Sequence, residues 1–191
     1  MNRRGLLWTL MAALAATFLP RRTRASPSGL RPPGAVPAGD FERACIGCFR
    51  CAEVCPPKAI RFSTLLSLEA VHPFVNPRES ACILCMKCTE ACPTEALTRI
   101  AADRDVVART VRMGTPVLER RDCLSWNGRG VCRLCYYVCP YAGTAVQLVG
   151  PRQAPLFQPE ACVGCGLCEE ACPEEAQAIR IRPRETAQCR G

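Results

Sequence analysis

Apolar residues form one long run near the amino terminus and only short runs further along the chain. The long run covers residues 6–19, and it is shorter than the roughly 20 residues that a membrane-spanning helix needs. After residue 40, alternating or apolar runs occur at residues 59–63, 96–100, 145–149 and 178–182, and runs of this length predict short strands. The segments between them are rich in cysteine, proline and glycine, so we expect no long regular helices.

The amino-terminal segment, residues 1–25, has the features of an export signal. Two arginines at positions 3 and 4 precede the apolar run, and the sequence TRA at residues 23–25 has the small–x–small form of a cleavage site. The adjacent arginines, followed by GLL, resemble the twin-arginine signal of the Tat export system. We therefore expect Tat export to the periplasm, with an ordinary Sec signal and an uncleaved membrane anchor as the alternatives.

Residues 26–39 differ in composition from the rest of the chain. They contain four prolines and three glycines, a composition typical of an extended linker with no core of its own. Folded sequence is therefore expected to begin near Asp40 and Phe41.

A cysteine motif occurs four times after residue 40. At residues 45–56, 82–93 and 162–173 the pattern is C-x₂-C-x₂-C-x₃-C-P, and the copy at residues 123–140 differs only in having eight residues between its first two cysteines. Each copy is followed by one of the short runs, so the repeated unit is a cysteine loop, one helical turn, a Cys-Pro stop and a strand. We expect a small, loop-rich α+β fold of two pseudo-symmetric dicluster-ferredoxin modules, at residues 40–105 and 106–185, with a tail at 186–191.

This spacing is that of a [4Fe–4S] site. A C-x₂-C-x₂-C loop wraps three thiolates around one face of an iron–sulfur cube, and the fourth cysteine ligates the other cluster of a two-cluster protein. Proline after it ends the turn, and glycine at positions 47, 164 and 166 allows close approach of the backbone. The sequence therefore predicts four [4Fe–4S] clusters as cofactors. Their predicted iron ligands are Cys45, Cys48, Cys51, Cys55, Cys82, Cys85, Cys88, Cys92, Cys123, Cys132, Cys135, Cys139, Cys162, Cys165, Cys168 and Cys172.

Which cysteine serves which cluster is left open by the spacing. If neighbouring copies pair, Cys92 completes the set of copy one and Cys55 that of copy two. Likewise, Cys172 completes copy three and Cys139 completes copy four. In a nested arrangement, copy one pairs with copy four and copy two with copy three. The predicted ligands are the same in both schemes.

Other uses of so many cysteines fit the sequence poorly. Zinc sites use pairs of C-x₂-C rather than a triple followed by x₃-C-P, and His72 is the only histidine. Disulfide frameworks are common in exported proteins, but the 17 cysteines are odd in number, and cysteines three apart on a tight loop are poor partners. Cys189 lies outside every copy and is expected to be a free thiol.

The formal charge of +8 does not indicate nucleic-acid binding. Five basic residues and no acid lie within residues 1–25, and each oxidised cluster with its thiolates carries about −2. No basic stripe with interleaved aromatics occurs either. Locally, copy three carries Arg133 and no acid among its last three cysteines, whereas copy four carries Glu169 and Glu170. We therefore expect the copy-three cluster to have the highest reduction potential and the copy-four cluster the lowest.

Three stretches of the chain resemble the NapG/MauM group of ferredoxin-type proteins. They are residues 33–45, residues 122–140 with the longer cysteine gap, and residues 161–172, and the Tat-like signal extends the similarity. The resemblance implies electron transfer in the periplasm, at the outer face of the inner membrane. It also implies a membrane-bound iron–sulfur partner that oxidises quinol, and an acceptor in the periplasmic nitrate reductase pathway or in methylamine utilisation. Membrane association would come through that partner or through an uncleaved signal.

The predicted function is that of an electron carrier without a substrate site of its own, and therefore not an enzyme. No acid/base pair or nucleophile accompanies the cysteines, and a carrier needs none. Two alternatives are a permanent electron-transfer subunit of an exported oxidoreductase complex and a non-redox maturation factor. Because the clusters would supply most cross-links, we expect the apoprotein to be largely unfolded.

Overall fold

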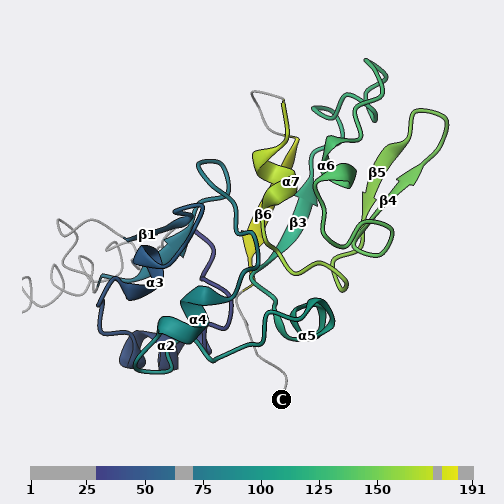
Figure 1. Ribbon diagram of the computed structural model, residues 1–191. Coiled ribbons are helices and arrows are strands. Elements are labelled where there is room, and N and C mark those ends of the chain that lie inside the picture. Colours follow the sequence, from purple (N-terminus) through teal and green to yellow (C-terminus); the bar gives the residue numbers. More distant parts are fainter. Residues whose placement is uncertain (1–28, 63–70, 174–177, 185–191) are drawn as a thin grey trace, which may run out of the picture.

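The computed structural model describes residues 29–62, 71–173 and 178–184. The predicted export signal and Cys189 lie outside these residues. The helices are α2 (Ala38–Ala44), α3 (Arg50–Glu53), α4 (Lys87–Ala91), α5 (Arg104–Thr110), α6 (Leu134–Tyr137) and α7 (Leu167–Glu170). The strands are β1 (Ile60–Phe62), β2 (Pro73–Val75), β3 (Gly114–Leu118), β4 (Val146–Val149), β5 (Ala154–Phe157) and β6 (Ile179–Pro183). In Figure 1 the elements α2, α3, α4 and β1 form one lobe, and α6, α7 and the strands β3, β4, β5 and β6 form the other.

The helices α3, α4, α6 and α7 are the helical turns that the cysteine motif predicts. Each follows a residue with left-handed backbone, which comes directly after the second cysteine of its copy. These residues are Phe49 (φ 62°), Met86 (φ 56°), Arg133 (φ 64°) and Gly166 (φ 91°). The left-handed region costs a residue other than glycine about 1–2 kcal/mol, yet three of the four copies place a side chain there. The left-handed backbone between the second and third cysteines is therefore imposed by the loop and does not depend on glycine.

Strands pair so that each half of the chain folds back on itself. In the carboxy-terminal half, β4 follows copy three and pairs antiparallel with β5, which precedes copy four. The longest ladder joins β3, before copy three, to β6, after copy four, from Gly114↔Pro183 to Leu118↔Ile179. In the amino-terminal half, β1 and β2 pair antiparallel in the same way as β4 and β5. The predicted pseudo-symmetry is therefore visible in the pairing of the strands.

One predicted strand, at residues 96–100, is wrong. This segment makes only an isolated bridge, between Leu97 and Ala35, where its counterpart β6 in the other half makes a full ladder. The partner segment has prolines at positions 32, 33 and 37, and α2 begins immediately afterwards. Proline has no N–H to donate to a ladder, so pairing stops after the hydrogen bonds of Val36 to Ala96 and of Thr98 to Gly34. The other three predicted strands correspond to β1, β4 and β6.

The expectation that residues 26–39 have no core contacts is also wrong for the part from residue 29 onward. The side chain of Leu30 is 1% exposed, and its backbone exchanges hydrogen bonds of 2.8 and 2.7 Å with Val75. Pro32 and Pro33 are fully buried as well. The segment is extended, as proline favours, but its apolar side chains are buried in the core instead of facing water.

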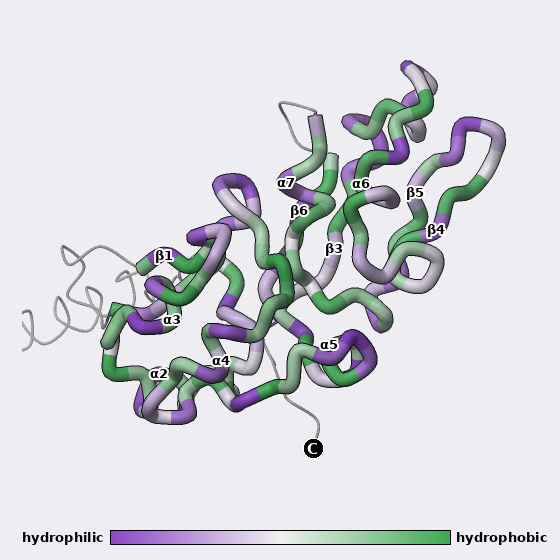
Figure 2. The backbone as a smooth tube through the Cα atoms, viewed as in Figure 1, coloured by the Kyte–Doolittle hydropathy of each residue, from purple (hydrophilic) through white to green (hydrophobic). Residues whose placement is uncertain are grey.

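A single hydrophobic core runs through both lobes and includes Leu30, Met86, Val163 and Ile179. Along the sequence, the helix α5 joins copy two to copy three, and its hydrophilic residues are purple in Figure 2. Its first turn is capped by Asp103, which accepts hydrogen bonds from the N–H groups of Asp105 and Val106. No helix among the described residues is long and apolar enough to cross a membrane.

Candidate iron–sulfur centres

The cysteines of copies one and two form two groups of four. Three cysteines of copy two, together with Cys55 of copy one, line a hollow of about 330 Å³. We call this set quartet two; it consists of Cys55, Cys82, Cys85 and Cys88. The rest of the hollow is apolar, with Pro33, Ile60, Val75 and Met86 among its lining residues.

Quartet one is the reciprocal set and consists of Cys45, Cys48, Cys51 and Cys92. The thiol of Cys45 interacts electrostatically with those of Cys92 and Cys48, and the thiol of Cys51 interacts with those of Cys45 and Cys48. Cys51 is buried, whereas Cys48 is exposed. Copies one and two therefore exchange their fourth cysteines.

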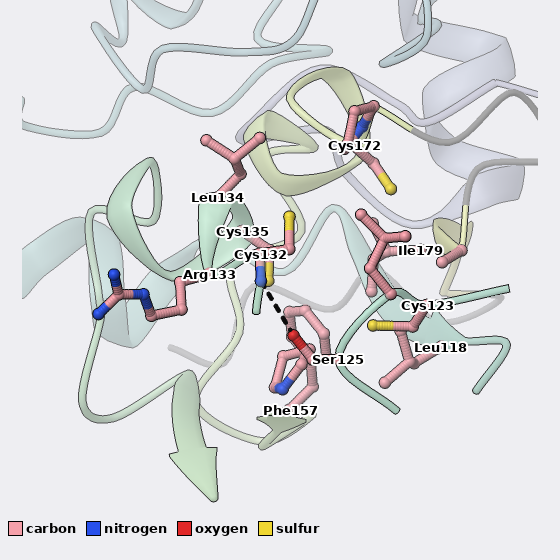
Figure 3. A pocket seen from close by; sticks show the side chains of 14 residues that line it. Leu118, Cys123, Ser125, Cys132, Arg133, Leu134, Cys135, Phe157, Cys172 and Ile179 are labelled. Carbon is pink, nitrogen blue, oxygen red and sulfur yellow. Dashed lines mark hydrogen bonds between the residues drawn. The ribbon is translucent and has the colours of Figure 1, made fainter. Parts of the chain in front are cut away.

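The same exchange occurs in the carboxy-terminal half. Quartet three consists of Cys123, Cys132, Cys135 and Cys172, and it lines a hollow of about 420 Å³ (Figure 3). Quartet four consists of Cys139, Cys162, Cys165 and Cys168, and it lines a hollow of about 360 Å³. The structure thus arranges the cysteines as neighbouring copies would pair them, and not in the nested scheme.

The thiols of the quartets are held in surroundings that disfavour bare thiolates. Burial, with smaller additions from neighbouring thiols, raises the pKa of Cys51 and Cys135 to about 12. Burial likewise raises the pKa of Cys82 and Cys165 to about 12, and that of Cys168 far above its ordinary value. Since iron binds the thiolate, the positive charge that a quartet needs to ionise must come from the group it binds.

Backbone N–H groups point at several of the sulfurs. The N–H of Leu84 lies 3.4 Å from the sulfur of Cys82, and the N–H of Gly164 lies 3.4 Å from that of Cys162. Leu84, Gly164 and Gly47 all have positive φ (60°, 76° and 64°), and each stands between the first two cysteines of its copy. This backbone turns an N–H inward, which stabilises negative charge on sulfur.

The surroundings of Cys92 lower the pKa of its thiol. Burial opposes the ionisation of its thiol, but N–H groups of Leu97, Thr94 and Ala96 and the hydroxyl of Thr94 together outweigh it. The hydroxyl oxygen of Thr94 lies 3.8 Å from the sulfur. The residues after the Cys-Pro pair of copy two therefore stabilise the thiolate of its fourth cysteine, which belongs to the quartet of copy one.

The quartets fit a cluster rather than one metal ion. Within the described ranges, no three His, Cys, Asp or Glu side chains converge closely enough to hold a single ion. Quartets two, three and four instead surround hollows whose linings are mainly apolar. A donor set made only of sulfur is that of iron–sulfur clusters or of structural zinc. Four thiols spread around a hollow match the cube and not the ion.

Copy three has a longer loop, and the sequence did not reveal the contacts that this loop makes. Ser125, 3% exposed, accepts a hydrogen bond of 3.1 Å from the N–H of Cys132, which Figure 3 shows at the wall of the quartet-three hollow. The indole of Trp126 donates to the carbonyl of Pro155 over 2.9 Å, and Arg120 lies over its ring. The longer loop, residues 124–131, thus closes one side of quartet three, and Trp126 packs there.

Models of iron–sulfur families match much of the chain. A 4Fe-4S dicluster domain matches residues 44–96, a 4Fe-4S double cluster binding domain residues 81–142, and a 4Fe-4S binding domain residues 155–177. Together with the cysteine quartets, these matches define a ferredoxin-type electron-transfer protein whose cofactors are [4Fe–4S] clusters.

Curated relatives align with most of the chain. The methylamine utilization ferredoxin-type protein MauM of Paracoccus denitrificans is 37% identical over 184 residues, which cover 92% of this chain and 79% of that protein. MauM of Methylorubrum extorquens is 36% identical over 93% of this chain and 83% of its own length. The ferredoxin-type protein NapG of Escherichia coli K12 is 35% identical over 93% of this chain and 81% of its own. The chain therefore belongs to the family of MauM and NapG ferredoxin-type proteins, which confirms the resemblance seen in the sequence.

Proposed function

We propose that the four quartets hold four [4Fe–4S] clusters, ligated by their sixteen cysteines, and that the chain relays electrons without a substrate site of its own. The observation that carries this proposal is the gathering of quartets two, three and four each around its own hollow, with one cysteine from the neighbouring copy. A cluster bound in such a hollow supplies reversible uptake of one electron.

The residues around the quartets prepare the hollows for that role. Apolar side chains such as Val163, Ile181 and Tyr141 in the wall of quartet four exclude water, and a dry site strengthens the effect of every nearby charge. The N–H groups that point at Cys82 and Cys162 favour the more negative, reduced state. The protein thereby adjusts the potentials while the ligands remain the same.

The donor and the acceptor are proposed from the family. The chain is similar to proteins named for methylamine utilization and to NapG. In this proposal a membrane-bound iron–sulfur protein oxidises quinol and reduces the chain, which then passes electrons to the periplasmic nitrate reductase pathway or to a methylamine-utilisation system. The chain works in the periplasm after Tat export, at the outer face of the inner membrane, as the arginine pair at residues 3 and 4 supports.

A permanent place in an exported oxidoreductase complex is the second candidate. Three large apolar side chains close to quartet three are exposed, namely Val131 (54%), Leu134 (40%) and Tyr137 (64%). Exposed apolar side chains that gather in one region are typical of protein–protein contacts. A stable catalytic subunit that co-purifies with the chain would favour this candidate over a diffusing carrier.

The proposal is tested on protein exported by its own signal and purified without oxygen. We expect the visible absorbance of the clusters to bleach when quinol and membranes are added together, and to remain when membranes are omitted. The matched controls are Cys189→Ser, outside every motif, which should behave as the wild type, and Cys172→Ser in quartet three, which should lose iron. Iron-loaded protein that quinol never reduces would identify a maturation factor instead, and protein without iron would overturn the proposal.

A further inference from the structure

The two halves of the chain meet directly at two cysteine loops. The backbone N–H of Cys82, the first cysteine of copy two, donates a hydrogen bond of 3.0 Å to the carbonyl of Cys165, the second cysteine of copy four. The thiols of these two residues also interact electrostatically. Quartets two and four are therefore joined through the backbone of their own residues.

Glycine at position 166 makes this approach possible. A Cβ on Gly166 would lie 2.5 Å from Cβ and 2.7 Å from Cγ of Pro77. The equivalent positions of the other copies hold Phe49, Met86 and Arg133, all with left-handed backbone. The left-handed conformation alone therefore does not require glycine at this position. Glycine is required because Pro77, in the segment that leads into copy two, lies too close for a Cβ.

Contacts inside each half connect the other quartets in pairs. Helix α3 contacts α4, and α6 contacts α7. The thiol of Cys88 in quartet two interacts with that of Cys51 in quartet one, and Phe157 lines the hollows of both quartet three and quartet four. Figure 1 shows the four short helices across the molecule in the order α3, α4, α7, α6.

We propose that the four quartets form one line in the order one, two, four, three, and that electrons cross between the halves at the Cys82–Cys165 contact. This inference rests on the proposed function, because it needs a cluster in every quartet. The step is the transfer of one electron from a reduced to an oxidised cluster, with no bond made or broken and no proton moved. The spatial order differs from the order along the sequence, and it makes quartets one and three the two ends at which redox partners exchange electrons.

Burial distinguishes quartet one, at one end of the line, from quartet four in its middle. Cys48 of quartet one is exposed, and the neighbouring side chains of Ile46 and Phe49 are 66% and 47% exposed. In quartet four, Cys165 and Cys168 are 7% and 8% exposed. A partner therefore reaches the sulfur of quartet one more closely than that of quartet four.

Magnetic coupling between reduced clusters tests the order without any activity measurement. Full-length protein is reduced completely, and its EPR spectrum is compared with those of two double variants that each lack one cluster. Cys132→Ala with Cys135→Ala removes the cluster of quartet three, and the three remaining clusters should all stay coupled. Cys85→Ala with Cys88→Ala removes the cluster of quartet two, and one remaining cluster, that of quartet one, should give an uncoupled spectrum.

The two double variants separate the alternatives. If the quartet-three variant gives an uncoupled spectrum, then the cluster of quartet four was coupled to the others only through that of quartet three. This is the order one, two, three, four, and it would overturn the inference. Iron and acid-labile sulfide are measured on the same samples. Wild-type protein without iron would defeat the proposed function itself, whereas iron-loaded protein with the wrong coupling pattern would defeat only the order.

A second comparison leaves all sixteen ligands in place. Gly166→Met gives copy four the residue that copy two has at this position and forces Pro77 away. We expect the coupling between the halves to weaken while the iron content stays that of the wild type. Phe49→Met changes the equivalent position at the far end of the line and should leave the coupling unchanged. Full iron content and unaltered coupling in Gly166→Met would contradict the role of this contact.

Discussion

Quartets three and four use the same cysteine motif in opposite surroundings. The helix α6 of quartet three buries none of its residues, and the loop before it exposes Val131. The helix α7 of quartet four buries Cys168 and Glu169, and Val163 in the preceding loop is 1% exposed. One motif therefore serves both at the surface and in the core, and its position in the fold decides which.

The charges beside these two quartets differ as well. Arg133 is held by a hydrogen bond of 2.8 Å to Gln153, and its guanidinium points away from the sulfurs in Figure 3. Glu169 is 4% exposed and accepts a hydrogen bond of 2.7 Å from the N–H of Ile181. Burial raises the pKa of this carboxyl, while that N–H and nearby arginines lower it. The comparison teaches that a charge inside the core shifts the reduction potential of its cluster more than an equal charge at the surface.

The largest difference is expected when each quartet is disabled in turn. Cys165→Ala with Cys168→Ala removes two buried ligands from the centre of the molecule, and most of the fold should be lost with them. Cys132→Ala with Cys135→Ala removes ligands at one end, and about three quarters of the iron should remain because the other quartets keep their packing. Iron analysis and far-UV circular dichroism of anaerobic protein measure both effects. Equal losses in the two variants would remove the distinction between core and end.

A methyl group added at Gly164, between the first two cysteines of copy four, is expected to have the next largest effect on stability. The Cβ of Gly164→Ala would collide with the backbone of Gly114 in β3, and the residue has φ +76°. Backbone strain and displacement of the strand together should cost about 2–4 kcal/mol. Gly143→Ala is the matched control, because it has φ +87° but nothing within 4 Å of the added Cβ; it should cost only the strain, about 1 kcal/mol. The temperature at which the cluster absorbance is lost compares the two variants.

The reduction potentials should respond unequally to loss of one charge. Glu169→Gln keeps an oxygen for the N–H of Ile181 and removes a buried negative charge, so the potential of quartet four should rise. A charge about 8 Å away at an effective dielectric of about 20 shifts a one-electron potential by roughly 90 mV before screening. Arg133→Gln should lower the potential of quartet three by less, because that guanidinium points away. An EPR-monitored redox titration gives both shifts, and a larger shift in Arg133→Gln would contradict the account.

The smallest expected effect lies in the loop that only copy three possesses. Trp126→Phe keeps an aromatic ring and removes the hydrogen bond to the carbonyl of Pro155, which is worth about 1 kcal/mol. The quartet-three cluster should then be lost somewhat faster in air, while quartet four is unaffected. The decay of the assigned EPR signals under oxygen measures this, and equal acceleration at both quartets would argue against a local role.

The sequence predicts the cysteine loops and their helical turns because the spacing of the cysteines is its most regular feature. Cysteine spacing predicts the loop and the short helices, and the structure has α3, α4, α6 and α7 where the spacing places them. The left-handed residues Phe49, Met86 and Arg133 were not predictable, because their side chains give no sign of a conformation that the loop imposes. Gly166 does show in the sequence, but its partner Pro77 lies far away along the chain and only the fold brings them together.

The errors have a common physical origin in contacts between distant segments. Proline-rich residues 29–37 have the composition of a linker, and their burial depends on Val75 and the core that lies behind it. The run at 96–100 alternates as a strand does, but a strand needs a partner with N–H groups to donate. The segment that it faces is rich in proline, so the run forms only an isolated bridge. The pairing of the quartets and their order in space are likewise properties of the fold, and repeats alone leave both open.

Native mass spectrometry of the exported protein, purified and sprayed without oxygen, tests the central claim most directly. The account predicts a mass that exceeds that of the polypeptide by four Fe₄S₄ units, with a loss of one unit in the double variant Cys132→Ala with Cys135→Ala. A mass equal to that of the bare or disulfide-bonded chain, or one raised only by single zinc ions, would contradict it.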